Sequence, residues 1–191
     1  MIEIKNISKK FGKLEVLKNV SVSCNSGQCI ALIGPNGCGK TTLIKSILGM
    51  VIPDSGSMEF NEKSIFGDYL YREKIGYMPQ IGRYPDTMTI GEIIEMVKKI
   101  RNSKDNLDED LFRDFEIEKM LNKQMRTLSG GTTQKISAVL AFLFNPDVLI
   151  LDEPTAGLDP LASELLKEKI KKKKKKGKLI IITSHLLSEL D

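Results

Sequence analysis

The sequence predicts a single α/β domain whose main sheet is parallel, and three observations support this prediction. The chain has 191 residues, which is the usual size of one domain. Its composition, 41% hydrophobic and 28% charged, is that of a soluble globular protein. Three short apolar runs, CIALI, VLIL and LIIIT, each lead into polar or glycine-rich residues and are separated by helical patterns, as buried parallel strands are.

The chain lacks the sequence features of membrane-spanning and secreted proteins. No stretch approaches the roughly 18 consecutive apolar residues that span a bilayer, and the start, MIEIKNISKK, has no signal-peptide core. Cys24, Cys29 and Cys38 are odd in number and lack the paired spacing of metal ligands, which indicates reduced thiols. We therefore expect a cytoplasmic protein.

The first apolar run leads into a glycine-rich loop that predicts a phosphate site. GPNGCGKT, residues 34–41, matches G-x-x-x-x-G-K-[ST], with a predicted strand at 30–33 before it and a helical pattern at 42–48 after it. In this pattern Lys40 reaches the β- and γ-phosphates and the Thr41 hydroxyl ligates Mg²⁺. A glycine turn with a chance lysine is the weaker alternative. The residues that let backbone N–H groups converge on phosphate are Gly34, Gly37 and Gly39.

Between Pro85 and about Phe144 the sequence turns helical. TIGEIIEMVKKI, residues 89–100, and DEDLFRDFEIEKMLNKQ, residues 108–124, place apolar residues at three- and four-residue spacings. LSGGTTQK then precedes a third helical pattern, ISAVLAFLF. Its Ser129, Gly130 and Gly131 are typical of a capped helix start, which is also an anion site. On these residues alone, a plain capped helix is the favoured interpretation.

Two acidic residues follow the second apolar run. Asp152 comes directly after VLIL, where a carboxylate at a strand terminus can hold Mg²⁺ directly or through water. Glu153 would point the other way if the strand geometry continues. That arrangement would place one acid on the metal and the other on an attacking water. Acidic residues also commonly end strands, so the phosphate loop is what makes this prediction specific.

The net charge of +4 comes from one lysine run. Nine lysines lie between Glu164 and Lys178, in a helical pattern that stops at Gly177. Lysines at a helix carboxyl end complement its dipole. We therefore favour a solvated helix end, and a patch that binds anionic lipid or nucleic acid is the alternative. The last apolar run follows, and it leads to His185, the only histidine, a residue type that titrates near neutral pH.

The order of the motifs GPNGCGKTT, YMPQ, LSGGT, VLILDEPTAGLD and TSH resembles the ATP-binding-cassette (ABC) ATPases, the nucleotide-binding subunits of ABC transporters. The resemblance covers nearly the whole chain. It implies a P-loop NTPase core with a mainly parallel sheet, an N-terminal antiparallel β part and a helical insert. The nucleotide-binding core would be about 1–84 and 145–191, and the helical subdomain about 85–144.

The resemblance also implies a role for each matched residue. Gln80, Glu153 and His185 would be catalytic, as the Q-loop glutamine, the catalytic glutamate and the switch histidine that contacts the γ-phosphate and attacking water. Asp152 would be the Walker B aspartate, and Thr41, Gln80 and Asp152 would hold Mg²⁺. The nucleotide-binding loop would comprise Gly34, Pro35, Asn36, Gly37, Cys38, Gly39, Lys40, Thr41 and Thr42.

In the family, two cassettes pair head to tail, and each ATP lies between the Walker A loop of one chain and the signature motif of the other. Ser129, Gly130 and Gly131 would therefore contact the partner's nucleotide. Phe11 matches the aromatic residue that stacks on adenine, with a core aromatic as the alternative. The signature departs from the common LSGGQ at Thr132, and Lys135 replaces a usual arginine. We expect activity to survive both departures.

The implied function is that of an ATP-binding and ATP-hydrolysing subunit that uses ATP and Mg²⁺ to power separate transmembrane permease subunits. A homodimer on the inner face of the membrane is expected, with no nucleic acid partner, and the resemblance is greatest to ABC-2-type systems. A soluble ABC ATPase outside transport is the alternative, whereas a P-loop kinase or small GTPase would not need LSGGT. Family cassettes continue past the switch histidine with a helix and a strand pair, so the sequence is either shortened or unusually compact.

Overall fold

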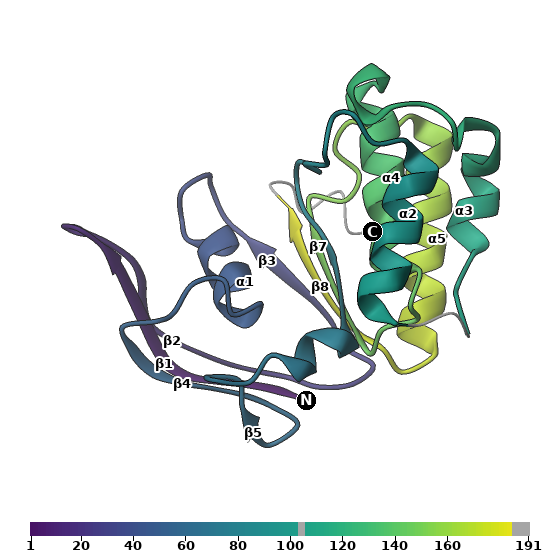
Figure 1. Cartoon of the computed structure of the whole chain (residues 1–191). Coiled ribbons are helices and arrows are strands. Elements are labelled where there is room, and N and C mark those ends of the chain that lie inside the picture. The colour runs from purple at the N-terminus through teal and green to yellow at the C-terminus, as the bar shows by residue number, and fades with distance from the viewer. Residues whose placement is uncertain (103–105, 185–191) are drawn as a thin grey trace.

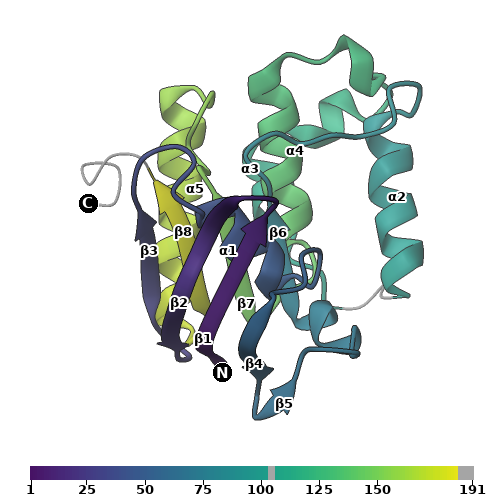
Figure 2. The same ribbon diagram turned by 90° about the vertical axis from the view of Figure 1, so that its left-hand side faces the viewer.

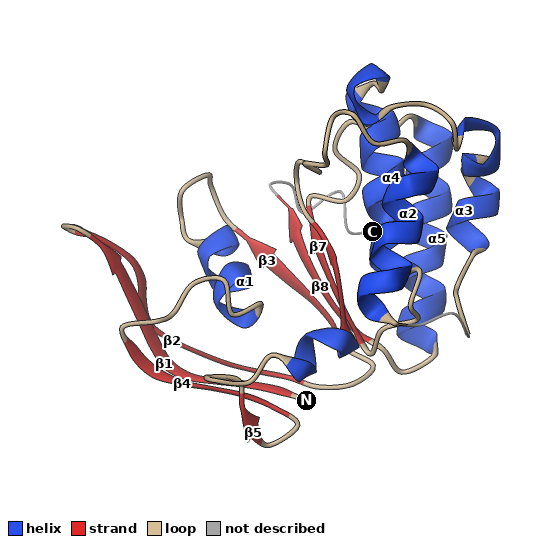
Figure 3. Ribbon diagram, in the orientation of Figure 1, coloured by secondary structure: helices blue, strands red, loops and turns tan. Residues whose placement is uncertain are grey.

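The computed structural model describes residues 1–102 and 106–184. It contains two separate β-sheets and a group of helices gathered on one side of the molecule (Figure 3). One sheet is antiparallel and comes from the N-terminal part of the chain, and the other is parallel. The α/β fold class, with an antiparallel part and a parallel part, is confirmed.

The parallel sheet has the strand order β3-β8-β7-β6. Every residue of β7 and β8 is buried, because layers of side chains cover both faces of these central strands. This explains why the sequence shows them as continuous apolar runs. The bounds are Cys29–Ile33 for β3, Ile75–Met78 for β6, Val148–Asp152 for β7 and Leu179–Ser184 for β8.

The antiparallel sheet has the strand order β2-β1-β4-β5. Along β1 the buried residues are Ile2, Ile4 and Ile7, and the register of β1 with β2 shifts between Ile4 and Ile7. The shift lets Ile4 and Ile7 both face the core although they are three residues apart in the sequence. The bounds are Ile2–Phe11 for β1, Leu14–Cys24 for β2, Ser55–Phe60 for β4 and Lys63–Ser64 for β5.

Helix α1, Lys40–Ile47, lies between the two sheets (Figures 1 and 2). Its Ile44 and Ile47 share one hydrophobic core with Ile4 of β1, Ile150 of β7 and Ile181 of β8. The alternate residues of β7 and β8 face a second core on the other side of the parallel sheet, beneath the helices. The start of α1 is thereby fixed at the end of β3, which is where the site lies.

The helical part departs from its sequence pattern in one place. Helix α2, Ile90–Arg101, starts with a capping box between Thr89 and Glu92, as a helix predicted over 89–100 should. The predicted helix over 108–124 is wrong in extent. It breaks at Glu116, whose φ of 52° is left-handed. What forms is α3, Asp110–Asp114, and a 3-10 turn, η2, Ile117–Met120.

Helices α4 and α5 complete the layer over the parallel sheet (Figure 1). Helix α4 follows the LSGGT motif and packs on β6, and α5 carries the lysine run. Within the described residues, 1–102 and 106–184, no helix is both long and apolar enough to cross a membrane. The bounds are Gly130–Phe142 for α4, Pro160–Lys175 for α5, Leu70–Lys74 for η1 and Met125–Thr127 for η3.

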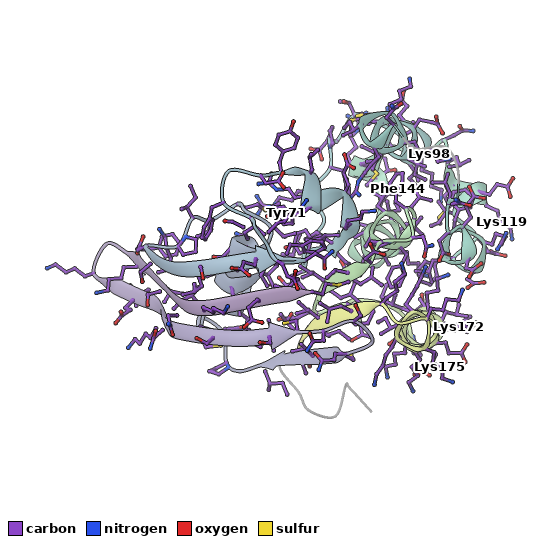
Figure 4. All side chains as sticks on the ribbon, turned by 90° about the horizontal axis from the view of Figure 1, so that it is seen from below. Tyr71, Lys98, Lys119, Phe144, Lys172 and Lys175 are labelled. Atoms are coloured by element: carbon purple, nitrogen blue, oxygen red, sulfur yellow. The ribbon has the colours of Figure 1, made fainter. Side chains whose placement is uncertain are left out.

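The solvated-helix interpretation of the lysine run is wrong for two of its lysines. Lys169 and Lys173 are only 5% and 2% exposed. Lys169 Nζ lies 2.5 Å from Asp108 Oδ1, and Lys173 Nζ lies 2.6 Å from Asp108 Oδ2. A buried ammonium group is tolerated because a carboxylate pairs with it. Other lysines of the run, including Lys172 and Lys175, project outward as expected (Figure 4).

Candidate functional site

The carboxyl ends of the parallel strands bring the predicted site segments to one edge of the sheet (Figure 1). The glycine-rich loop, residues 34–42, follows β3, and Gln80 follows β6. Asp152 is the last residue of β7, and Glu153 is the next. His185, the predicted switch histidine, lies outside the described residues. The sequence therefore predicted correctly which edge carries the polar residues.

The phosphate loop, as we name residues 34–42, is shaped by close backbone contacts. Gly39 has a φ of 102°, and a Cβ at this position would lie 2.8 Å from Val16 O of β2. Only glycine tolerates both this left-handed φ and this close approach of a backbone oxygen. Helix α1 begins at the next residue, so the N–H groups of its first turn have no partner within the helix and point into the loop. This is the geometry that binds a phosphate anion.

Lys40 lies across this loop. Its Nζ donates hydrogen bonds to Gly34 O and, at 3.1 Å, to Pro35 O, and it is 3.9 Å from Cys38 Sγ. These carbonyl partners belong to the loop itself. An ammonium group held there can move to phosphate oxygens with little displacement, because phosphates bound at the helix start would occupy the same concavity.

Asp152 is held by a residue that the sequence analysis did not single out. The Thr183 hydroxyl donates a 2.5 Å hydrogen bond to Asp152 Oδ1 and accepts one from the Glu153 N–H at 3.0 Å. Asp152 is 3% exposed. Burial, and then the charge of Asp152, raises the pKa of neighbouring Tyr77 to about 12. Thr183 occupies the register position directly beside Asp152 in the adjacent parallel strand, a pairing that no local sequence pattern reveals.

Glu153 does not continue the strand. Its φ of 50° is left-handed, so the backbone leaves the extended conformation at this residue. The alternation of side chains along a strand, which would point Glu153 away from Asp152, therefore does not apply. Instead, the Gln80 side chain holds its carboxylate: Gln80 Nε2 donates to Glu153 Oε2 at 2.9 Å. The turn after β7 thus brings together two residues 73 positions apart in the sequence.

The signature segment, residues 128–132, forms the start of α4. Ser129 is the N-cap, and its hydroxyl accepts from the Thr132 N–H at 3.2 Å. A Cβ at Gly131 would lie 2.7 Å from Gly157 O, so the two backbones are in direct contact. Lys135 pairs with Asp159 at 2.6 Å, and this bond lowers the pKa of Asp159. The segment is an N-capped helix start joined to the turn that follows β7.

Phe11, at the end of β1, is 50% exposed, which excludes the core-aromatic alternative. Its ring lies 5.5 Å from Lys9 Nζ. The β1–β2 hairpin that carries it reaches the phosphate loop through the contact between Val16 and Gly39. An exposed ring on that hairpin can offer a flat apolar face to a ligand held by the loop.

Within one chain, the phosphate loop and the start of α4 are apart. Figures 1 and 2, which view the molecule at right angles, both draw the loop between β3 and α1 away from the end of α4 that carries the signature segment. The phosphate loop and the N-capped start of α4 are therefore two separate candidate anion sites.

Comparisons with known proteins agree with this geometry. The family model described as "ABC transporter" matches residues 17–156. The "Nod factor export ATP-binding protein I" of Ralstonia nicotianae is 31% identical over all of this chain, which spans 61% of that relative. A solved "ATP binding subunit of ABC transporter" is 32% identical, with a TM-score of 0.90 over 98% of this chain and 80% of the other. A dimeric bacterial ABC transporter cassette is 25% identical, with a TM-score of 0.87 over 100% and 90%.

Proposed function

Because the chain belongs to the ABC transporter family, we propose that it is an ATP-binding and ATP-hydrolysing subunit that powers separate membrane subunits by ATP-driven head-to-tail dimerisation. The observation that carries the proposal is the arrangement of the two anion sites. One follows β3 at the sheet edge that also carries Asp152 and Glu153, and the other lies apart from it on the same chain. A second copy rotated by a two-fold axis would bring each signature segment over the partner's phosphate loop.

ATP would bind along the phosphate loop. The N–H groups of residues 37–42 surround the phosphates, and Lys40 exchanges the carbonyls of Gly34 and Pro35 for β- and γ-phosphate oxygens. Phe11 stacks on the adenine ring. In the dimer, Ser129 and the amides of Gly130 and Gly131 contact the γ-phosphate of the ATP bound to the partner, with Thr132 and Lys135 not required for that contact.

The residues present fit a magnesium ion. Thr41 and Asp152 offer the hydroxyl and carboxylate oxygens that this hard cation prefers, with Gln80 as a further oxygen ligand. Thr183 orients the Asp152 carboxylate through its 2.5 Å hydrogen bond. When bound with ATP, Mg²⁺ neutralises charge on the phosphates.

Glu153 is the proposed general base. Its carboxylate accepts a proton from the water that attacks the γ-phosphate, and the Gln80 amide holds that carboxylate in place. The left-handed backbone at Glu153 lifts the side chain out of the strand and towards Gln80. By the family resemblance, His185 contacts the same water and the γ-phosphate.

The helical subdomain, about 85–144, with the segment around Gln80, would dock onto transmembrane permease subunits at the inner face of the cell membrane. An ABC-2-type system is the proposed subfamily, with a homodimer of this chain. A tag on this chain, followed by purification from native membranes, tests the transport role. Recovery of a polytopic membrane protein supports it, and recovery from the soluble fraction alone favours the non-transport alternative.

Replacing the base tests hydrolysis directly. Glu153→Gln keeps the size of the side chain and removes its charge, so ATP hydrolysis should fall by a factor of about 10² to 10⁴, the usual contribution of a general base. Bound ATP should then accumulate and trap a dimer, which light scattering after size exclusion would detect. The matched control is Glu168→Gln, on the exposed side of α5, which should hydrolyse ATP at the parent rate. Parent-rate hydrolysis by purified Glu153→Gln would contradict the proposal.

A further inference from the structure

The loop between β6 and α2, which carries Gln80, has to be held in place for Gln80 to reach Glu153. Its Ile81 is 69% exposed, so this large apolar side chain does not anchor the loop in the core. The 2.9 Å hydrogen bond from Gln80 to Glu153 joins the ends of two long side chains and is exposed to solvent. A second point of attachment is found four residues further on.

That attachment is the side chain of Tyr84. Its hydroxyl lies 2.9 Å from Ser137 Oγ, in the middle of α4. Ser137 Oγ also donates to Thr133 O at 3.1 Å. A serine hydroxyl carries one proton, so in this pair Tyr84 is the donor and Ser137 the acceptor. Burial raises the pKa of Tyr84, which keeps the phenol protonated and able to donate at neutral pH.

Gly82 brings the backbone of the loop onto the same serine. A Cβ at Gly82 would lie 2.3 Å from Ser137 Oγ and 2.8 Å from the Tyr84 ring. No side chain fits between the loop and α4 at this point. The loop is therefore in direct contact with the helix, and the part-buried Tyr84 hydroxyl fixes the orientation of that contact.

Helix α4 connects this contact to the signature segment. Ser137 lies about two turns beyond the N-cap Ser129, roughly 12 Å along the helix axis. We propose that Tyr84 is a positioning residue, which docks the Gln80 loop on α4 and so keeps Gln80 directed at Glu153. The inference rests on the proposed function, because its catalytic consequence requires Glu153 to act in ATP hydrolysis.

The expected consequence affects turnover more than binding. The phosphate loop lies on α1, on the opposite side of the parallel sheet from α4, so ATP affinity should not change. Without the Tyr84 hydrogen bond, Gln80 is directed at Glu153 for a smaller fraction of the time. Tyr84→Phe should lower kcat for ATP about threefold to tenfold, the effect of one neutral hydrogen bond.

The test combines two single variants with their double variant. Tyr84→Phe and Ser137→Ala remove the two ends of the same bond, so the double variant should have nearly the kcat of the more affected single variant. Tyr69→Phe is the matched control, because it removes the same hydroxyl from a side chain that is 69% exposed, and its kcat should equal that of the parent. Losses that multiply in the double variant, or parent-like kcat in Tyr84→Phe, would overturn the proposal.

Trypsin cleavage gives a readout that does not need ATPase activity. Arg83 is exposed and lies in the loop, and cleavage after it requires the loop to leave α4. Ser137→Ala leaves the cleaved sequence unchanged and should accelerate cleavage after Arg83, measured by mass spectrometry of the folded protein, about threefold to tenfold. Cleavage of Ser137→Ala at the parent rate would overturn the positioning role. A lack of ATPase activity in the parent protein would instead contradict the proposed function, so the two failures can be distinguished.

Discussion

Cys38 is the residue through which the phosphate loop is most accessible to chemical attack. Its thiol is exposed and lies 3.9 Å from Lys40 Nζ, and a Cβ at Gly34 would be 2.7 Å from Cys38 Sγ. A group attached to this sulfur would therefore occupy the space of the phosphates. We expect a maleimide to inactivate ATP hydrolysis and MgATP to slow the inactivation, as followed by residual activity over time.

The other two cysteines provide the controls. Cys24 is buried, and desolvation raises the pKa of the Cys29 thiol, with Lys174 only partly offsetting it, so both should react slowly. Cys38→Ser should stay active and resist the reagent, because serine preserves the small size of the side chain. Cys29→Ser should remain as sensitive as the parent. If Cys38→Ser were inactivated at the parent rate, the attack would lie elsewhere.

At the scale of elements, the contact between α5 and the segment before α3 is an ion cluster around Asp108. Burial acts to raise the pKa of Asp108, but the hydrogen bonds and charges of Lys169 and Lys173 outweigh it, so the pKa is lowered. A carboxyl group with a lower pKa in the folded state stabilises that state above its unfolded pKa. This contribution is lost as the pH falls below about 5, which is near the value at which unfolded aspartate begins to take up protons.

Asp108→Asn should destabilise the protein by about 3–5 kcal/mol, because the buried Lys173 ammonium loses its carboxylate partner and the buried Lys169 ammonium keeps only the half-exposed Asp110. Urea unfolding at neutral pH measures this loss. Between pH 5 and 3 the variant should also lose less further stability than the parent does. The matched control is Asp110→Asn. Its side chain is 51% exposed and bonds Lys169 at the rim of the cluster, so its cost should stay below about 1 kcal/mol. Equal costs for the two variants would contradict this account of α5.

These elements also show what the sequence could and could not predict. The strands β3, β7 and β8 and the helix α1 follow from local patterns, because their apolar runs and turn residues are adjacent in the chain. The burial of Lys169 and Lys173 depends on Asp108, about 60 residues away, which no local pattern reveals. The break at Glu116 likewise preserves apolar spacing, with Phe115 and Ile117 both buried, so periodicity alone could not detect it.

Part of the candidate site could likewise be predicted from local sequence patterns, and part could not. The phosphate loop and Asp152 were predicted because the loop directly follows a strand and Asp152 ends one. The link between Gln80 and Glu153, the hydrogen bonds of Thr183 and the contact of Tyr84 with Ser137 all join residues from different strands or helices. Their partners are set by sheet register and helix packing, which are properties of the tertiary fold.

For the whole molecule, the proposed function requires a second copy of the chain to complete each active site. The geometry supports a route of coupling within each chain. The signature segment contacts the turn after β7 through Gly131 and Gly157, and one turn further along α4 Lys135 pairs with Asp159, at the end of that turn, at 2.6 Å. Binding of the partner's ATP to the signature segment would therefore act on the turn that begins with Glu153.

Mixing two inactive variants tests this claim most directly. Lys40→Ala removes the main phosphate contact and leaves the signature segment intact. Ser129→Asp keeps a favourable N-cap for α4 but places a negative charge against the partner's γ-phosphate. Each variant alone should hydrolyse little ATP, since both sites of either homodimer are defective.

In a mixed dimer, the intact phosphate loop of the Ser129→Asp chain faces the intact signature segment of the Lys40→Ala chain, which rebuilds one complete site. The measurement is the ATPase rate of the two purified variants before and after mixing at equal concentration. The account predicts that mixing restores hydrolysis, to the extent that mixed dimers form. A mixture no more active than its separate components, although the chains are shown to exchange, would contradict it and place the complete site within one chain.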